Sequence, residues 1–420
     1  MKQVLFSIPQ IMRSSLLPLS KLSLLGLFLS SFLISSFTFA QDWVWTGEVD
    51  NNFSTAGNWL VDGSPTTEGP NAASRLSYEF NLAAGGTVNL DGGTNFAASS
   101  ITFGSGAGAF TFQTADNTHF RNATGSSGTS AMSITQNSNS IHTFEVRFDG
   151  MHDGANFSGT GTGNLVFESE LRMFNRTADL NVNTTTYRPI WEGAIYTNSA
   201  NRRRNFGGSG TFEISGASTG TNTNVSTKSG TGTLLITNQS GYALGNVPLV
   251  ANSGTLAGTG AVTEALLTVG SGMILSPGMH GDTVAAGNEI GTLTSNDMLL
   301  NEGFIYNWDF NATDSDRFVL NGELDLGDSN SALSIINLVG DMGDFNPLSN
   351  NVLFTFDSIV GASNGQVLSW QINHNDVDSG YFAVVSGNDV LVAIPEPSTY
   401  AAIFAGLALG VVLLRRRLRK

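Results

Sequence analysis

The sequence predicts an all-β protein in which short strands stack as a solenoid, and three observations support this prediction. Glycine is abundant, at 49 of 420 residues, and charged residues amount to only 13%, which favours short strands with tight turns over long helices. Hydrophobic residues make up 40% of the chain and aromatic residues 10%, enough for a core and too many for a disordered chain. A glycine-rich motif also recurs, as expected when each coil repeats the one before. A β-sandwich is the alternative fold.

The recurring motif reads G-x-G-x-[LF]-x-[FI], and it begins at Gly106, Gly161, Gly208 and Gly230. We expect its glycines to form a sharp turn with positive φ, which is sterically free for this residue. The large residues at the fifth and seventh positions then point to one side of a strand. The last two copies begin 22 residues apart, about one coil, and the earlier gaps of 55 and 47 residues correspond to about two coils each.

A more specific pattern runs through residues 230–330. It consists, in order, of the segments GTGTLLITNQSGY, NSGTLAGTGAV, LLTVGSGMILSPG, IGTLTSNDMLL and DRFVLNGELDLG. This pattern resembles the autotransporter-associated β-strand repeat, closely over 230–330 and loosely over 100–230. The resemblance implies a right-handed parallel β-helix, and we assign the solenoid repeats to residues 101–330.

The segment before the repeats, residues 41–100, is expected to cap the solenoid. It contains Trp43, Trp45 and Trp59, and the first two alternate around Val44, so they share one face of a strand. One interpretation is a cap, because the end of a β stack needs large side chains to close its core. The other is a platform on which a sugar ring stacks.

The segment after the repeats, residues 331–393, has longer apolar strands at hairpin-like spacing. We expect either the last coils with a cap or a small antiparallel unit.

Targeting features occupy both ends of the chain. Residues 1–21 are mildly basic and residues 22–37 are apolar. Thr38-Phe39-Ala40 then provides small residues at the two positions that signal peptidase reads. This order predicts a signal peptide over residues 1–40 that signal peptidase cleaves after Ala40.

The other end, residues 394–420, has three parts. The motif Pro395-Glu396-Pro397 precedes an apolar stretch at about 398–414, which as a helix would be about 25 Å long and just able to span a membrane. A basic run follows, and it predicts a stop-transfer signal that leaves the body outside the inner membrane; it includes Arg415, Arg416 and Arg417. The three parts closely resemble the PEP-CTERM sorting signal. The resemblance implies that an exosortase cleaves near the Pro-Glu-Pro motif and passes the protein to the cell surface or an exopolysaccharide matrix; a permanent anchor is the alternative.

Charge and cysteine content exclude several functions. The formal net charge is −15, but eight of the 19 basic residues and one of the 34 acidic residues, Glu396, lie in the two end segments. This leaves 11 basic against 33 acidic residues between them, a charge of −22. Such a body repels nucleic acid, so no nucleic-acid partner is expected. The chain has no cysteine, which excludes thiol catalysis, thiolate metal sites and disulfides.

No catalytic motif stands out among the ionisable residues. The histidines are scattered without metal-ligand spacing; they are His119, His142, His152, His280 and His374. Three pairs of aspartates are better explained as solvated turns than as Ca²⁺ ligands, and no other cofactor is expected; the pairs are Asp314 and Asp316, Asp325 and Asp328, and Asp341 and Asp344. The run Arg202-Arg203-Arg204 is a solvated loop tip or, in a lyase, the source of the catalytic base.

These observations favour a non-enzymatic, structural or adhesive protein of the cell surface or extracellular matrix, with extracellular polysaccharide as a partner. The alternative is a β-helix polysaccharide lyase or glycoside hydrolase that acts on acidic polysaccharide.

Overall fold

The computed structural model describes residues 42–70, 75–93, 95–122, 131–149, 153–173, 178–197, 203–219, 224–278, 290–345, 351–375 and 377–394. The predicted signal peptide with Ala40 and the predicted sorting signal from Pro395 onward lie outside these residues. Within the described residues, no helix is long and apolar enough to cross a membrane. The predicted membrane span at about 398–414 lies outside the described residues.

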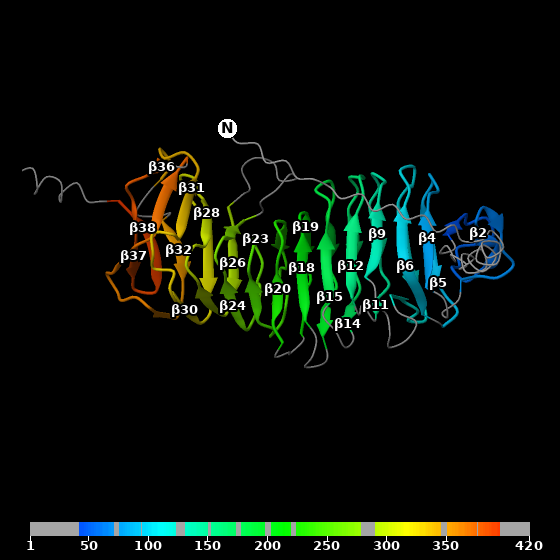
Figure 1. Cartoon of the computed structure of the whole chain (residues 1–420), viewed down its shortest axis with the longest axis horizontal. Coiled ribbons are helices and arrows are strands. Elements are labelled where there is room, and N and C mark those ends of the chain that lie inside the picture. Colours follow the sequence, from blue (N-terminus) through cyan, green and yellow to red (C-terminus); the bar gives the residue numbers. More distant parts are fainter. Residues whose placement is uncertain are drawn as a thin grey trace, which may run out of the picture. The chain divides into compact units, whose positions relative to one another are not determined.

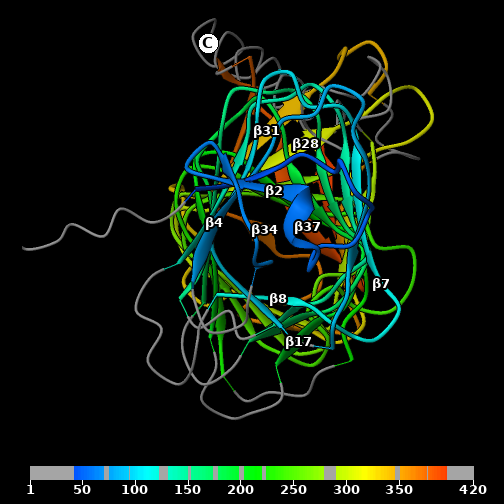
Figure 2. The same cartoon turned by 90° about the vertical axis from the view of Figure 1, so that its right-hand side faces the viewer.

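The described chain is all-β, and its strands form long parallel sheets on three sides of a common core (Figures 1 and 2). Figure 2 looks along the stack and shows β4, β7 and β8 on three different sides. The first sheet contains β1 (Asp42–Trp45), β4 (Leu76–Phe80), β6 (Phe96–Phe103), β9 (Met132–Gln136), β12 (Gly154–Ser158), β15 (Ala178–Val182), β18 (Arg204–Gly208), β20 (Ser226–Lys228), β22 (Leu249–Ala251), β24 (Leu266–Val269), β27 (Asp297–Leu300), β30 (Glu323–Asp325) and β33 (Ser358–Val360).

The second sheet lies on the next side of each coil. It contains β5 (Gly86–Leu90), β7 (Phe110–Thr114), β10 (His142–Phe144), β13 (Leu165–Phe167), β16 (Pro189–Trp191), β19 (Thr211–Ile214), β21 (Thr233–Ile236), β23 (Gly254–Gly258), β25 (Met273–Pro277), β28 (Ile305–Asp309), β31 (Ile335–Val339) and β35 (Gln371–His374).

The third side is built in two stretches. The start of β6 pairs with β8 (Phe120–Arg121), and β11 (Phe148–Asp149), β14 (Leu171–Met173) and β17 (Ile195–Thr197) follow; further along lie β26 (Thr292–Ser295), β29 (Arg317–Leu320) and β32 (Val352–Thr355). Irregular segments connect the two stretches. Ile195 N–H donates to Ser218 Oγ at 3.0 Å, Ser218 Oγ donates to Ala243 C=O at 2.8 Å, and Val262 N–H donates to Thr294 C=O at 2.8 Å. Backbone groups on this side therefore stay paired where no regular strand is present.

The parallel pairing confirms the predicted coil spacing. The four motif copies lie on β7, β13, β19 and β21 of the second sheet. β19 and β21 are neighbours, with Thr211 opposite Thr233, whereas β10 separates β7 from β13 and β16 separates β13 from β19. The 22-residue gap is thus one coil, and the two longer gaps are two coils each. These parallel ladders differ from the antiparallel sheets of the alternative β-sandwich.

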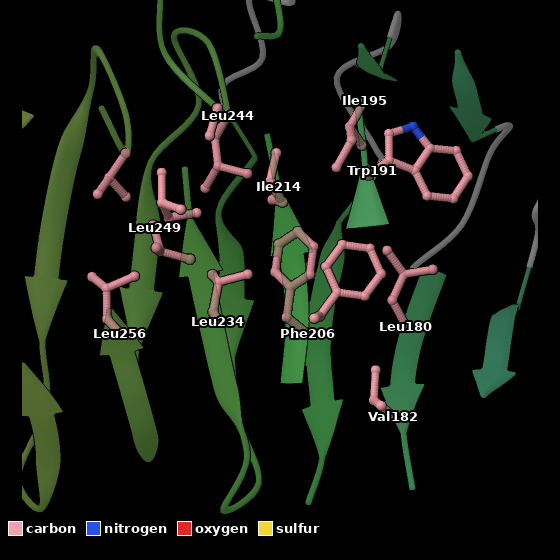
Figure 3. Packing of buried hydrophobic residues seen from close by; sticks show 14 of the residues in the cluster. Leu180, Val182, Trp191, Ile195, Phe206, Ile214, Leu234, Leu244, Leu249 and Leu256 are labelled. Atoms are coloured by element: carbon pink, nitrogen blue, oxygen red, sulfur yellow. The ribbon is translucent and has the colours of Figure 1, made fainter. Parts of the chain in front are cut away.

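Large side chains from corresponding positions of successive coils fill the core. Phe112, Phe144, Phe167 and Trp191 stack face to face along the second sheet, with ring centroids 4.7, 4.9 and 4.4 Å apart. Such a pair contributes about 0.5–1.5 kcal/mol beyond the burial of its area. Beyond Trp191 this column continues with Ile214 and Ile236. Leu234 and Leu256 are opposite one another on the same sheet (Figure 3).

Both ends of the described chain close with antiparallel strands. At the first end, β1 pairs with β2 (Trp59–Val61), which pairs with β3 (Ser64–Pro65), and a short 3₁₀ turn, η2 (Ala56–Asn58), precedes β2. At the other end, β36 (Val377–Asp378) pairs with β35, and β34 (Val367–Leu368), β37 (Phe382–Ser386) and β38 (Asp389–Ala393) extend from β32. Residues 331–393 therefore contain both the last coils and a small antiparallel unit, the two possibilities expected from the sequence. The last coils are those in which β31, β33 and β35 continue the parallel ladders.

Two different structural requirements select glycine in the motif: a positive φ and a close approach of two backbones. The expected positive φ is found at Gly208 (+89°) and Gly230 (+73°), but Gly106 and Gly161 lack it. The second glycine of each copy is needed for another reason, because a Cβ there would overlap a backbone carbonyl of the preceding coil. The positions and carbonyl oxygens involved are Gly108 with Ala83, Gly163 with Ser140, Gly210 with Thr184, and Gly232 with Gly210.

The first motif copy offers a matched test of this close approach. We predict that Gly108→Ala destabilises the protein by more than about 1 kcal/mol, because its Cβ would overlap Ala83 C=O. Gly106→Ala should change stability by less than about 0.5 kcal/mol, because its Cβ would make only an ordinary contact with Asn81. Urea unfolding followed by circular dichroism measures both midpoints, and equal midpoints would contradict this explanation.

Candidate functional site

The three tryptophans near the start of the body lie inside the protein. Trp43, Trp45 and Trp59 are 6%, 3% and 1% exposed. The Trp45 and Trp59 rings are 5.1 Å apart, and Trp59 Nε1 donates to Phe53 C=O at 2.7 Å. A sugar-stacking platform needs an exposed ring face, whereas these rings fill the end of the core. We therefore retain the interpretation of this segment as a cap.

The described histidines occupy different environments and do not form a common site. His119 is buried beside an ion pair, with its Nε2 3.2 Å from Asp149 Oδ2 and Arg147 Nη2 3.1 Å from the same oxygen. His374 is only partly buried and lies 3.2 Å from Gly340 C=O. His152 and His280 lie outside the described residues.

His142 is a core residue of β10. Its ring stacks on Phe103 at 3.7 Å, its Nδ1 accepts the Phe110 N–H at 3.2 Å, and its Nε2 lies 2.8 Å from Ser138 Oγ. Because Nδ1 accepts, the proton of the neutral ring is on Nε2 and is donated to Ser138. Burial lowers the pKa of His142 to about 4. This side chain stabilises the core and touches no open surface.

The pKa of His142 predicts a stability loss in acid. Its folded-state pKa of about 4 is below the ordinary 6.5, so its contribution is complete above about pH 6.5 and is lost as the pH falls towards 4. Over this range the wild type should lose up to about 3 kcal/mol more than His142→Gln, which cannot titrate. Denaturant unfolding at a series of pH values measures how the free energy of unfolding of the wild type and of His142→Gln changes with pH. Equal pH dependence of the free energy of unfolding for His142→Gln and the wild type would contradict the prediction.

The arginine run is divided between surface and core. Arg202 lies outside the described residues, and Arg203 is exposed. Arg204 is 1% exposed in β18, and its Nη2 donates to Leu244 C=O at 3.4 Å. The expectation of a solvated loop tip is therefore wrong for Arg204, because the alternation of β18 turns this side chain inward together with Phe206. Burial lowers the pKa of the guanidinium to about 10, so it stays charged at neutral pH.

The predicted aspartate turns are mostly local hydrogen-bonded turns. Asp325, Asp328 and Asp341 accept the N–H groups of Gly327, Glu302 and Gly343. Their distances are 2.8, 2.7 and 2.8 Å. In the part of the chain that the structure describes, no three His, Asp or Glu side chains gather in a group that could hold a metal ion.

Asp316 differs from the other aspartates because it is fully buried. Its Oδ1 accepts the Gly291 N–H at 2.7 Å, and its Oδ2 accepts the Asp309 N–H at 3.2 Å. Burial raises the pKa of Asp316, and the neighbouring Asp309 carboxylate raises it further. Asp314, its expected partner, is exposed in the adjoining turn.

A polar depression opens on the outer face of the second sheet, where β5, β7 and β10 end. Its volume is about 520 Å³, and seven of its nine lining residues carry an amide, a carboxylate or a hydroxyl group. The lining residues are Asn52, Asn89, Leu90, Asp91, Gln113, Thr114, Ala115, Asp116 and Glu145.

One column of side chains crosses this depression. Asn52 forms a parallel bridge with Asn89, and Asn89 is opposite Gln113. Phe112 is opposite Phe144 on the next coil, so Glu145, which follows Phe144, continues the column after Gln113. Gln113 Nε2 donates to Asn89 Oδ1 at 2.6 Å, which fixes the two amides relative to each other. Gln113 and Glu145 are exposed. Successive members are about 4.8 Å apart, the strand spacing of a sheet.

Two carboxylates of the depression are already hydrogen-bonded by the protein. Asp91 accepts Ser54 N–H at 2.9 Å and Ser54 O–H at 2.6 Å. Asp116 accepts the Thr118 O–H at 2.6 Å, and the Thr118 hydrogen bonds lower the pKa of Asp116 to about 2. Asp116 therefore stays ionised, and both side chains shape the wall. Glu145 is the carboxylate of the depression with no such hydrogen bond among the described residues.

Sequence reasoning missed this depression, although the chain carries a signal for it. The three strands contain Thr-Val-Asn, Thr-Phe-Gln and Thr-Phe-Glu, which end at Asn89, Gln113 and Glu145. Each places a large polar residue at the same outward position of a successive coil. Asn89 and Glu145 lie on coils without a copy of the glycine motif, and Gln113 directly follows a copy. A search for the glycine motif therefore does not detect this row of polar residues.

In comparisons with protein-family models, curated protein sequences and solved structures, nothing matches this chain. The interpretation of the depression therefore rests on its own residues.

Proposed function

We propose that this chain is an exported, non-enzymatic structural or adhesive protein of the cell surface or extracellular matrix that associates with extracellular polysaccharide. The observation that supports this proposal most is the uninterrupted parallel pairing of successive coils over an apolar core. Each coil satisfies the backbone groups of its neighbours, so the stack provides a large, regular exterior without disulfides.

The exterior of the first sheet supports an adhesive role. Asn181 Nδ2 donates to Asn156 Oδ1 at 3.1 Å, Asn205 Nδ2 donates to Asp179 Oδ1 at 3.1 Å, and Thr227 Oγ1 donates to Asn205 Oδ1 at 3.0 Å. These side chains form ordered rows of amide, carboxylate and hydroxyl groups. Such groups match the hydroxyls of a hydrated polysaccharide.

The finer parts of the proposal come from the sequence. The repeat pattern at 230–330 supports a right-handed parallel β-helix. The two end segments support cleavage after Ala40, transient anchoring in the inner membrane through a helix at about 398–414, and processing by an exosortase near Pro395-Glu396-Pro397. The destination is the cell surface or the extracellular matrix.

The sorting proposal predicts the two ends of the mature protein. Protein recovered from the cell surface should begin at Gln41 and end near Pro395–Pro397, which intact-mass and peptide mass spectrometry will measure. In the double variant Pro395→Ala/Pro397→Ala, the protein should stay in the inner-membrane fraction with its basic tail. Surface protein that keeps the sequence RRRLRK would contradict processing.

The non-enzymatic proposal has its own test. The full chain, purified in a mild detergent, is incubated with uronate-rich polysaccharide, and ultraviolet absorption detects unsaturated products. We expect none. Release of such products would support the lyase alternative, and loss of that release in Arg203→Ala would assign the base.

A further inference from the structure

We propose that the polar depression formed by Asn52, Asn89, Gln113 and Glu145 binds an uncharged, hydroxyl-rich polysaccharide chain laid along the stack. This inference rests on the proposed association with polysaccharide and names both the site and the chemistry of the ligand.

The spacing and chemistry of the site match those of a sugar chain. The column supplies one amide or carboxylate per coil, about 4.8 Å apart, which is close to the length of one hexose unit in an extended chain. An amide both donates and accepts, and a carboxylate accepts, so adjacent column members meet adjacent hydroxyls of a sugar. The exposed Ala115 methyl group at the edge offers a small apolar contact for ring C–H groups.

The side chains of the site are held in place before any ligand binds. The Gln113–Asn89 hydrogen bond of 2.6 Å fixes the orientation of both amides, and the Ser54 and Thr118 hydrogen bonds fix the walls. A pre-ordered site loses less side-chain entropy on binding. Gln113 keeps its Oε1 and one N–H available to a ligand, since its hydrogen bond to Asn89 uses only one N–H.

The charge of the site determines the charge of its ligand. Asp91, Asp116 and Glu145 line the depression. The column continues beyond it with Glu168 and Glu192, because Phe144 pairs with Phe167 and Phe167 with Trp191. Burial raises the pKa of Glu192, and the Glu168 and Glu213 carboxylates raise it further. Negative potential therefore accumulates along this face, and a uronate chain would be repelled.

Native gel electrophoresis through polysaccharide-containing gels tests this site. The full chain in a mild detergent is run through gels that contain a neutral β-glucan, dextran or mannan, and through gels that contain alginate. We expect retardation by at least one neutral polymer and none by alginate. Gln113→Ala should weaken binding at least tenfold, because it removes the central amide. Glu145→Gln should bind at least as tightly as the wild type, because it keeps an acceptor and removes a charge.

Asn337→Ala is the matched control. It breaks the same kind of amide pair, Asn337 Nδ2 to Asn307 Oδ1 at 3.0 Å, in the same sheet and far from the depression along the stack. It should bind like the wild type. Unchanged binding by Gln113→Ala would refute the site but leave the proposed association with polysaccharide in place. Retardation by alginate alone would refute the uncharged ligand, and retardation by no polymer would count against both proposals.

Discussion

The in-register stacking of one coil on the next is the constraint on which the rest of this structure depends. Each inner strand uses its backbone N–H and C=O groups to pair with the coils before and after it, so a shift by one residue would turn its apolar side chains outward. The chain has no disulfide that would prevent such a shift. Register must therefore be set by the side chains, and by the places where only glycine allows two backbones to approach.

The consequence of this register is that side chains form columns. On the inside, the column from Phe112 to Trp191 puts four rings on top of one another, and any slip would separate them. On the outside, the same rule aligns Asn89 with Gln113 and brings their amides to 2.6 Å. A residue that is unremarkable in sequence thus acquires partners that are one coil away. The core and the candidate site are two results of one geometric rule.

This rule explains how much the sequence could predict. The spacing of the glycine motif predicted the coils, including the two-coil gaps, because stacking requires a nearly constant chain length per coil. The same motif could not predict that Gly108 serves close approach rather than positive φ, since both needs select glycine. The inward direction of Arg204 was also missed. A charged run predicts a solvated loop, but the position of Arg204 two residues before Phe206 on one strand places it in the core.

The row of glutamates on the second sheet, Glu145, Glu168 and Glu192, is not a product of stacking alone. On the third side, Arg121 lies opposite Asp149, and Arg172 occupies the next coil, so charges alternate in sign. On the second sheet, Glu145, Glu168 and Glu192 follow one another with the same sign. Two like charges about 5 Å apart repel by nearly 1 kcal/mol even at the dielectric constant of water. The chain alternates the sign of charge on one side and tolerates this repulsion on another. Stacking therefore does not explain the row of glutamates beside the depression, whereas the proposed selection against acidic polysaccharide does.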